Sequence, residues 1–203
     1  MNFIKSDGKE NYPSKIVCIG RNYVDHIREL GNEIPTEPVF FLKPNSAISA
    51  EIRAGDSDEI HYEAELSFMV SAGKLATVGF GLDLTKREIQ SRLKAKGLPW
   101  ERAKAFDGAA VFSEFISFNG NIDELTLELY INDRLVQQGG YDLMINKPDE
   151  ILSEAGKFLS FENGDLLMTG TPKGVGQLRY GDRMTGKIYA KEHLLVESNW
   201  VVK

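Results

Sequence analysis

The sequence predicts a β-rich protein of the α+β class. Its apolar residues lie mostly in short runs or in period-two alternation bounded by glycine, proline and asparagine, which is typical of strands and turns. Helical periodicity is confined to a few short segments. With 203 residues, of which 42% are hydrophobic and 27% charged, the chain is long enough to bury a sizeable core. We expect a short N-terminal extension over residues 1–14 and one domain over residues 15–203.

The composition argues against several classes of partner. A net charge of −6 disfavours a surface for nucleic acid or anionic membrane, since both need clustered Lys and Arg. No apolar run approaches the ~20 residues that a membrane helix requires. The N-terminus has no apolar signal core, and Cys18 is the single cysteine, so an intrachain disulfide is excluded. We therefore expect a cytoplasmic protein.

The first segments predict a strand, a helix and a second strand. Residues 15–20 (KIVCIG) form a β-branched apolar run that ends at glycine, as in a buried strand. Residues 21–30 are expected to form a short helix, with Asn22 as its N-cap and Gly31 as its stop. Residues 38–44 (PVFFLKP) then form a short strand between two prolines.

Two side chains of the expected helix are candidates for acid–base chemistry. His26 and Glu29 are three residues apart and are therefore neighbours on one helix face. A carboxylate beside an imidazole fixes its tautomer and raises its basicity, as a water-activating base requires. An exposed polar helix face has the same pattern, so the pair alone leaves both interpretations open.

The stretch from His61 to Leu66 (HYEAEL) carries two nearby carboxylates. If it is a strand that continues to Phe68, Glu63 and Glu65 point to one side, while Ala64, Leu66 and Phe68 point to the other. Like charges at this spacing repel unless a cation lies between them or one carboxylate takes up a proton. A divalent metal is the simpler explanation, and a solvated strand face is the alternative.

A hairpin and a helix are expected next. Residues 71–74 (SAGK) form a turn, and residues 78–83 (VGFGLD) form a second strand that ends at Asp83. Thr85 and Glu88 have the spacing of a capping box, so we expect Thr85 to be the N-cap of the following helix.

Further polar side chains could contact an anionic ligand. Arg87 and Gln90 are three residues apart and emerge beside Asp83, where they could hold a carboxylate or a carbonyl. Lys104 follows a glycine–proline turn and could point at an anion. Lys43 is either a rim charge or a carboxylate binder, and solvent-facing positions are the alternative for the helix residues.

The C-terminal half continues the β-rich pattern. Residues 125–131 alternate, and the Asn132-Asp133 turn makes them part of a hairpin. Residues 148–159 form an amphipathic helix with proline at its first position. The loop 169–176 (TGTPKGVG) lacks the Lys-Ser or Lys-Thr pair of a P-loop, but its N–H groups and the Thr171 hydroxyl could approach a small anion. Further strands are expected over residues 165–168, 186–191 and 194–202.

Six stretches, in order, resemble the fumarylacetoacetate hydrolase family, in particular its short acylpyruvate hydrolase and oxaloacetate decarboxylase or tautomerase branch. They cover most of the chain and read IVCIGRNYVDHIREL, PVFFLKP, HYEAEL, LDLTKREIQ, KGLPWERAKAF and GDLLMTGTPKGVG. A chance match to six stretches in sequence is implausible. The resemblance implies a β-roll of mixed sheets with a few peripheral helices, usually a homodimer, in which residues 15–203 form the catalytic domain.

The resemblance also implies the site. Glu63, Glu65 and Asp83 would bind Mg²⁺ or Mn²⁺, and His26 and Glu29 would form a catalytic dyad on a lid that closes over substrate. Carboxylates without cysteine or a second histidine at ligand spacing suit a hard cation. The expected contacts with a small 2-oxo acid are Arg21, Lys43, Arg87, Gln90, Lys104 and Thr171.

The expected activity is hydrolysis of the carbon–carbon bond of an acylpyruvate, of the acetylpyruvate or fumarylpyruvate type. The metal would polarise the 2-oxo group and stabilise the pyruvate enolate, while His26, oriented by Glu29, would activate water. Alternatives on the same site are oxaloacetate decarboxylation, keto–enol tautomerisation, or isomerisation of a 2-hydroxydienedioate. A dicarboxylate-binding module is the non-enzymatic alternative, and the spacing of the dyad argues against it.

Two features are less usual. The connection between Glu65 and Asp83, residues 66–82, has only 17 residues, whereas relatives usually carry a longer insertion with a helix there. We therefore expect a bare hairpin at this wall of the site. His61 is either a partner of the metal ligands or a structural histidine, and we favour the structural role.

Overall fold

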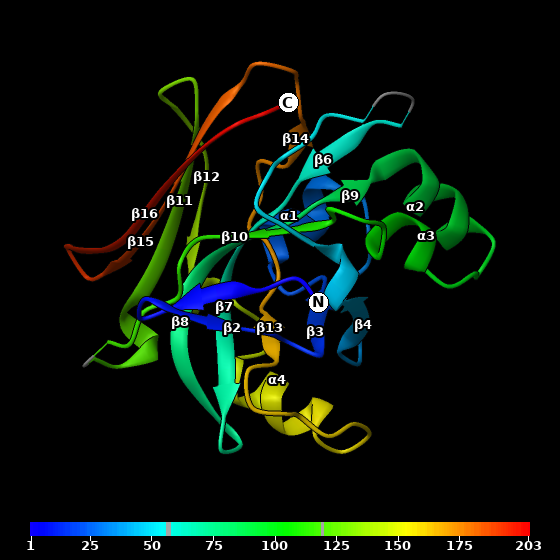
Figure 1. The fold of residues 1–203 in the computed structure, drawn as a ribbon. Coiled ribbons are helices and arrows are strands. Elements are labelled where there is room, and N and C mark those ends of the chain that lie inside the picture. Colours follow the sequence, from blue (N-terminus) through cyan, green and yellow to red (C-terminus); the bar gives the residue numbers. More distant parts are fainter. Residues whose placement is uncertain (56–57, 119) are drawn as a thin grey trace.

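The computed structural model describes residues 1–55, 58–118 and 120–203 and has the predicted architecture, a β-rich α+β roll of mixed sheets with few helices (Figure 1). A seven-stranded mixed sheet runs through the molecule. In spatial order its strands are β4 (Val39–Pro44), β3 (Lys15–Gly20), β13 (Leu166–Met168), β7 (Ala64–Ser71), β8 (Lys74–Asp83), β10 (Ala110–Phe112) and β5 (Ile48–Ser49). The pairs β3–β13 and β10–β5 are parallel.

In the described part of the chain, three smaller sheets and four α-helices lie around it. The four-stranded antiparallel sheet stands on one side, and α2 and α3 stand on the other (Figure 1). Its strands are β12 (Arg134–Gly140), β11 (Leu125–Ile131), β15 (Arg183–Ala190) and β16 (His193–Val201). A three-stranded sheet contains β14 (Gly176–Gln177), β6 (Ile60–Tyr62) and β9 (Thr85–Lys86). A two-stranded sheet contains β1 (Ile4–Ser6) and β2 (Lys9–Asn11). The helices are α1 (Val24–Glu29), α2 (Arg87–Ala95), α3 (Glu101–Lys104), α4 (Pro148–Ala155) and the 3₁₀ turns η1 (Asn45–Ala47), η2 (Ile122–Glu124) and η3 (Tyr141–Leu143).

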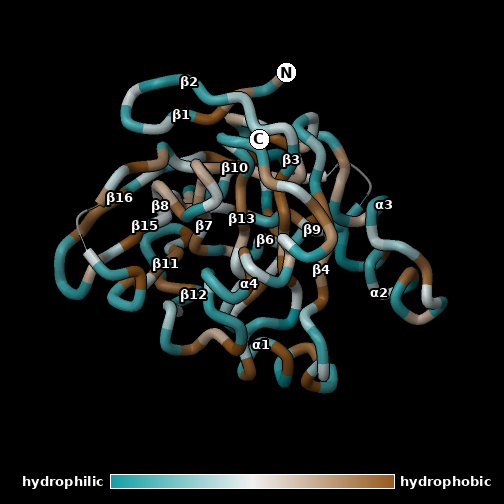
Figure 2. Tube along the Cα trace, turned by 90° about the horizontal axis from the view of Figure 1, so that it is seen from below, coloured by the Kyte–Doolittle hydropathy of each residue, from teal (hydrophilic) through white to brown (hydrophobic). Residues whose placement is uncertain are grey.

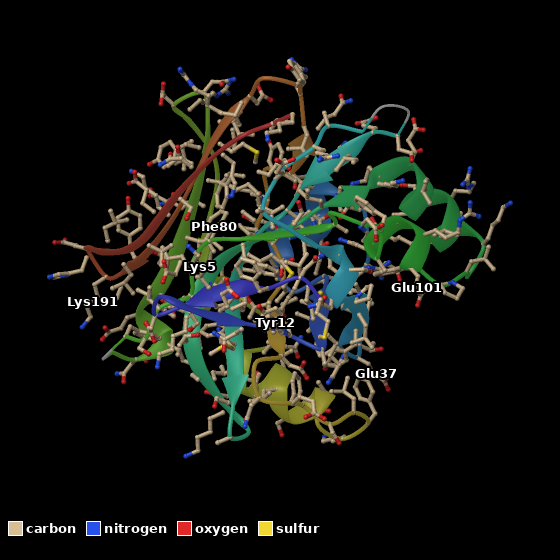
Figure 3. All side chains as sticks on the ribbon, in the orientation of Figure 1. Lys5, Tyr12, Glu37, Phe80, Glu101 and Lys191 are labelled. Carbon is tan, nitrogen blue, oxygen red and sulfur yellow. The ribbon has the colours of Figure 1, made fainter. Side chains whose placement is uncertain are left out.

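The largest core lies between the seven-stranded and four-stranded sheets. Leu66 and Phe68 of β7 project into it, as the predicted alternation requires, and meet Leu127 of β11 and Ile188 of β15. Each fully buried Leu or Phe contributes roughly 1.5–3 kcal/mol. Hydrophobic stretches follow the inner strands and hydrophilic ones the outer turns (Figure 2). Phe80, labelled in Figure 3, packs with its ring centroid 5.9 Å from that of Trp200.

The N-terminal hairpin and α4 cover other parts of the sheet. Ile4 of β1 is 4% exposed and clusters with Ile16 and Phe115. On α4, Ile151 packs against Val17 of β3, and the helix begins at proline as predicted. It ends at Ala155 rather than at residue 159. Within the described residues, no helix is long and apolar enough to cross a bilayer.

The predicted strand around the two glutamates is interrupted. Glu63 belongs to no strand, because β6 ends at Tyr62 and β7 begins at Ala64. The two strands join different sheets, β6 pairing with β14 and β9, and β7 with β13 and β8. Glu63 is therefore the residue at which the chain passes from one sheet to the other. Downstream, β7 and β8 form the bare hairpin that the short connection predicts.

Two predicted helix caps are wrong. Asn22 does not cap α1, which begins at Val24, because its side-chain oxygen accepts the N–H of Asn146 at 2.7 Å and its amide donates to the carbonyl of Thr169 at 2.8 Å. Thr85 does not cap α2, since β9 pairs with β6 and holds it extended, and its hydroxyl contacts the Lys104 ammonium at 2.6 Å. In both cases tertiary hydrogen bonds outcompete the local cap.

Candidate metal centre and active site

The three predicted metal ligands converge. One carboxylate oxygen from each of Glu63, Glu65 and Asp83 lies within 4.8 Å of the others, and the residues are 5%, 1% and 1% exposed. The hairpin register produces this arrangement, because Ala64 of β7 stands opposite Leu82 of β8. The Asp83 N–H then donates to the Glu63 carbonyl at 2.8 Å.

Two of the three carboxylates are paired with cations. The Lys104 ammonium lies 2.8 Å from Glu63 and 2.6 Å from Asp83. The Arg87 guanidinium also bonds Glu63 and reaches the Gln90 carbonyl oxygen at 2.8 Å. Burial alone would raise the pKa of Glu63, but Lys104 and Arg87 outweigh it and lower that pKa. Burial likewise opposes charge on Lys104, yet Asp83 and Glu63 raise its pKa.

Glu65 has a different environment. Within residues 1–55, 58–118 and 120–203, no cationic side chain lies within ion-pair distance of it, and its carboxylate accepts the N–H of Gly170 at 2.7 Å. Burial, followed by the charges of Asp83 and Glu63, raises its pKa well above the usual range. A divalent cation would relieve this repulsion. Buried, hard carboxylate oxygens therefore fit Mg²⁺ or Mn²⁺.

Of the predicted dyad, His26 lines the same cavity as the triad, and Glu29 contacts His26 from outside the cavity lining. Nδ1 of His26 is 3.3 Å from Oε2 of Glu29, and the histidine is only 6% exposed. Burial lowers the pKa of His26, although the charges of Glu63 and Glu29 oppose the shift. The imidazole is therefore neutral at pH 7, and the contact with Glu29 assigns its proton to Nδ1 and leaves Nε2 as the acceptor.

The glycine-rich loop after β13 holds both groups. The Gly174 N–H donates to the two Glu29 oxygens at 3.0 and 3.2 Å, so the loop orients the dyad, while the Gly170 N–H holds Glu65. Both glycines have positive φ, +99° and +89°. A Cβ on Gly174 would lie 2.0 Å from the Val136 carbonyl oxygen. The sequence predicted N–H groups directed at an anion; in the structure these anions are the protein's own carboxylates.

Most predicted substrate contacts line one small cavity of about 30 Å³, together with the triad and His26. They are Arg21, Arg87, Gln90, Lys104 and Thr171. A cavity of this size holds one or two water molecules and is too small for a 2-oxo acid.

Lys43 departs from its predicted role as a substrate contact. It is fully buried and does not line the cavity. Its ammonium pairs with Asp83 at 2.8 Å and donates to the Ala109 carbonyl at 2.9 Å. Lys43 therefore braces a predicted metal ligand from behind. His61 also lies outside the cavity lining, with Nε2 2.5 Å from Glu59.

Two residues near the site were not predicted. Gln137 of β12 is 1% exposed; its carbonyl oxygen accepts the Ala64 N–H at 2.9 Å, and its amide donates to the Thr171 hydroxyl at 2.8 Å. Nothing in the β12 sequence marks it. Lys94 lines the cavity from α2, and here a signal existed, because it follows Gln90 by four residues and so shares its helix face.

The fold and the site together define a β-rich enzyme class with a buried carboxylate cradle and a histidine–glutamate dyad. Residues 15–197 match the family described as fumarylacetoacetate (FAA) hydrolase, C-terminal. The chain belongs to this fumarylacetoacetate hydrolase family.

Curated relatives carry a more specific name. The chain is 40% identical over 195 residues to oxaloacetate tautomerase YcgM of Escherichia coli K12, covering 86% of this chain and 89% of the relative. It is 36% identical over 191 residues to human mitochondrial oxaloacetate tautomerase FAHD1, with 86% of each chain covered.

Solved structures show the same fold. A protein of Oleispira antarctica classed with the fumarylacetoacetate isomerases and hydrolases superimposes with a TM-score of 0.94 at 33% identity, covering 100% of both chains. Fumarylpyruvate hydrolase of Pseudomonas aeruginosa, in complex with Mn²⁺ and pyruvate, gives a TM-score of 0.90 at 29% identity, covering 99% of this chain and 95% of that one.

Proposed function

We propose that this protein interconverts the keto and enol forms of oxaloacetate with the help of a bound Mg²⁺ or Mn²⁺. The observation that carries the proposal is a buried His26 that lines the same small cavity as the carboxylate triad. The names of the relatives favour this reaction, which the sequence suggested as an alternative, over acylpyruvate hydrolysis.

The side chains divide the work of proton transfer. A divalent cation held by the triad would polarise the 2-oxo group and stabilise charge on its oxygen. Nε2 of His26 takes the proton from C3 of the keto form, and Glu29 stabilises the imidazolium. The imidazolium then delivers a proton to the 2-oxygen, so the enol forms without consuming water. Arg87 and Thr171 offer donors to the 1-carboxylate.

Acylpyruvate hydrolysis is the second candidate function. The similarity to fumarylpyruvate hydrolase in its Mn²⁺ and pyruvate complex supports it. The same dyad would then deprotonate water, which would attack the distal carbonyl and break the carbon–carbon bond. This reaction needs room for both an acyl group and a water molecule, so α1 would have to open further than for tautomerisation.

The two candidates are separated by assaying both reactions. Enol loss from oxaloacetate and hydrolysis of acetylpyruvate are followed by ultraviolet absorbance, with Mg²⁺, with Mn²⁺ and with chelator. We expect metal-dependent tautomerisation to be the faster reaction and His26→Ala to lower it by about 10²–10⁴-fold. His193→Ala, which changes an exposed histidine, is the matched control. Tautomerisation that is indifferent to chelation or to His26→Ala would refute the proposal.

A further inference from the structure

The cationic side chains of the cavity fall into two groups. Arg87 and Lys104 are paired with the carboxylate triad. The other cations that line the cavity are Arg21, which follows β3, and Lys94, on the last turn of α2. Among the described residues, neither Arg21 nor Lys94 has a carboxylate within ion-pair distance. Positive charge in this part of the cavity is therefore uncompensated by the protein.

Each of these two cations is held in place by its surroundings. The Lys94 ammonium donates to the Asn32 side-chain oxygen at 3.0 Å and lies 5.9 Å from the centroid of the Trp100 ring. These are neutral partners, and an ammonium has three donors, so others remain for a ligand. The Nε of Arg21 is buried without a hydrogen-bond partner among the described residues, which leaves a desolvated donor unsatisfied.

Two further observations indicate that this arrangement costs energy without a ligand. Arg21 has φ +58°, a left-handed conformation that is strained for a non-glycine residue. Such strain is concentrated at ligand sites. Burial, followed by the charges of Arg21 and Arg87, lowers the pKa of Lys94. An anion bound between these cations would offset both the burial and the mutual repulsion.

We propose that Arg21 and Lys94 form a second anion subsite, which binds the distal carboxylate of a four-carbon 2-oxo dicarboxylic acid. This rests on the proposed function in one respect: the 1-carboxylate and 2-oxo group lie toward the triad. The subsite makes the enzyme selective for dicarboxylates. It places the distal carboxylate against α2 and Asn32, away from the cations that the triad already neutralises.

The test compares two 2-hydroxy acids, malate and lactate, which share the 1-carboxylate and the 2-oxygen and differ by the distal carboxylate. Their dissociation constants for the Mn²⁺-loaded full chain are measured by calorimetry. The wild type is expected to prefer malate by about 100-fold, with about tenfold from the charge-assisted hydrogen bond that each of the two cations makes. Lys94→Met and Arg21→Gln should each remove about tenfold of this preference and leave lactate binding within about twofold.

Controls separate charge recognition from folding. Lys94→Arg should retain the preference, and so should Arg92→Met, which removes an exposed charge from the same helix. A purely structural role of Lys94 would weaken both acids equally and so overturns the proposal, as does a wild type that binds them equally. If tautomerisation is present but both charge-removing variants keep the malate preference, the subsite is refuted and the proposed function stands. If tautomerisation is absent but the preference depends on both residues, the subsite stands.

Discussion

Replacing Gly174 by alanine should disable the dyad without touching it directly. A Cβ at this position would lie 2.0 Å from the Val136 carbonyl oxygen, and contacts below about 3 Å do not occur, so the loop must move by about 1 Å. The two Gly174 N–H contacts with Glu29 then lengthen, and His26 loses its orientation. A misplacement of about 1 Å costs a catalytic group ~100-fold in rate, or about 2.7 kcal/mol.

A second glycine provides the control. Gly164 has φ +95°, close to the +99° of Gly174, but nothing lies within 4 Å of its Cβ position. Gly164→Ala therefore introduces the same backbone strain, about 1–2 kcal/mol, without the collision. Both variants are compared for kcat on oxaloacetate and for thermal unfolding. If Gly174→Ala keeps a kcat within about threefold of Gly164→Ala, the loop does not orient the dyad.

Three other predictions follow from buried groups. Burial lowers the pKa of His26, and only the neutral ring accepts a proton, so kcat/KM should fall only below pH 6.5. A midpoint of the kcat/KM profile above pH 6.5 would contradict this. Lys43→Met should destabilise the apoprotein by about 3–5 kcal/mol, because Asp83 loses one of its two buried cationic partners. Mn²⁺ should then raise the Tm of the variant more than that of the wild type. An equal rise in Tm would refute the bracing role of Lys43. Gln137→Met should raise KM more than it lowers kcat, because Thr171 loses the donor that orients its hydroxyl. If this is correct, steady-state kinetics of Gln137→Met, Thr171→Val and the double variant will show non-additive effects.

The sequence predicted best where one physical rule acts alone. Alternation along β7 placed Leu66 and Phe68 in the core, and the short connection to Asp83 predicted a hairpin. Both follow from the pleat and from chain length, which distant residues do not alter. The triad itself was expected from the family resemblance, and the register of this hairpin brings its members together.

Predictions that relied on local hydrogen bonding failed because distant partners compete for the same atoms. The Thr85 hydroxyl, expected to cap a helix, contacts Lys104, and the Asn22 side-chain oxygen accepts the Asn146 N–H. Lys43 was expected to be either a rim charge or a carboxylate binder; it is fully buried, and the carboxylate that it binds belongs to Asp83. Gln137 lies on a strand whose sequence gives no sign of the site, and only the folding of β12 against Ala64 brings it there.

The position of β13 has a consequence for synthesis. This strand comes late in the chain, yet it lies between β3 and β7, pairing with both. The N–H of Gly170, two residues beyond it, holds Glu65. During synthesis, β3 and β7 therefore remain unpaired at this edge until β13 is made, more than ninety residues after β7. A nascent chain that ends before Gly170 lacks the N–H group that holds Glu65, so it cannot complete the site of Glu63, Glu65 and Asp83.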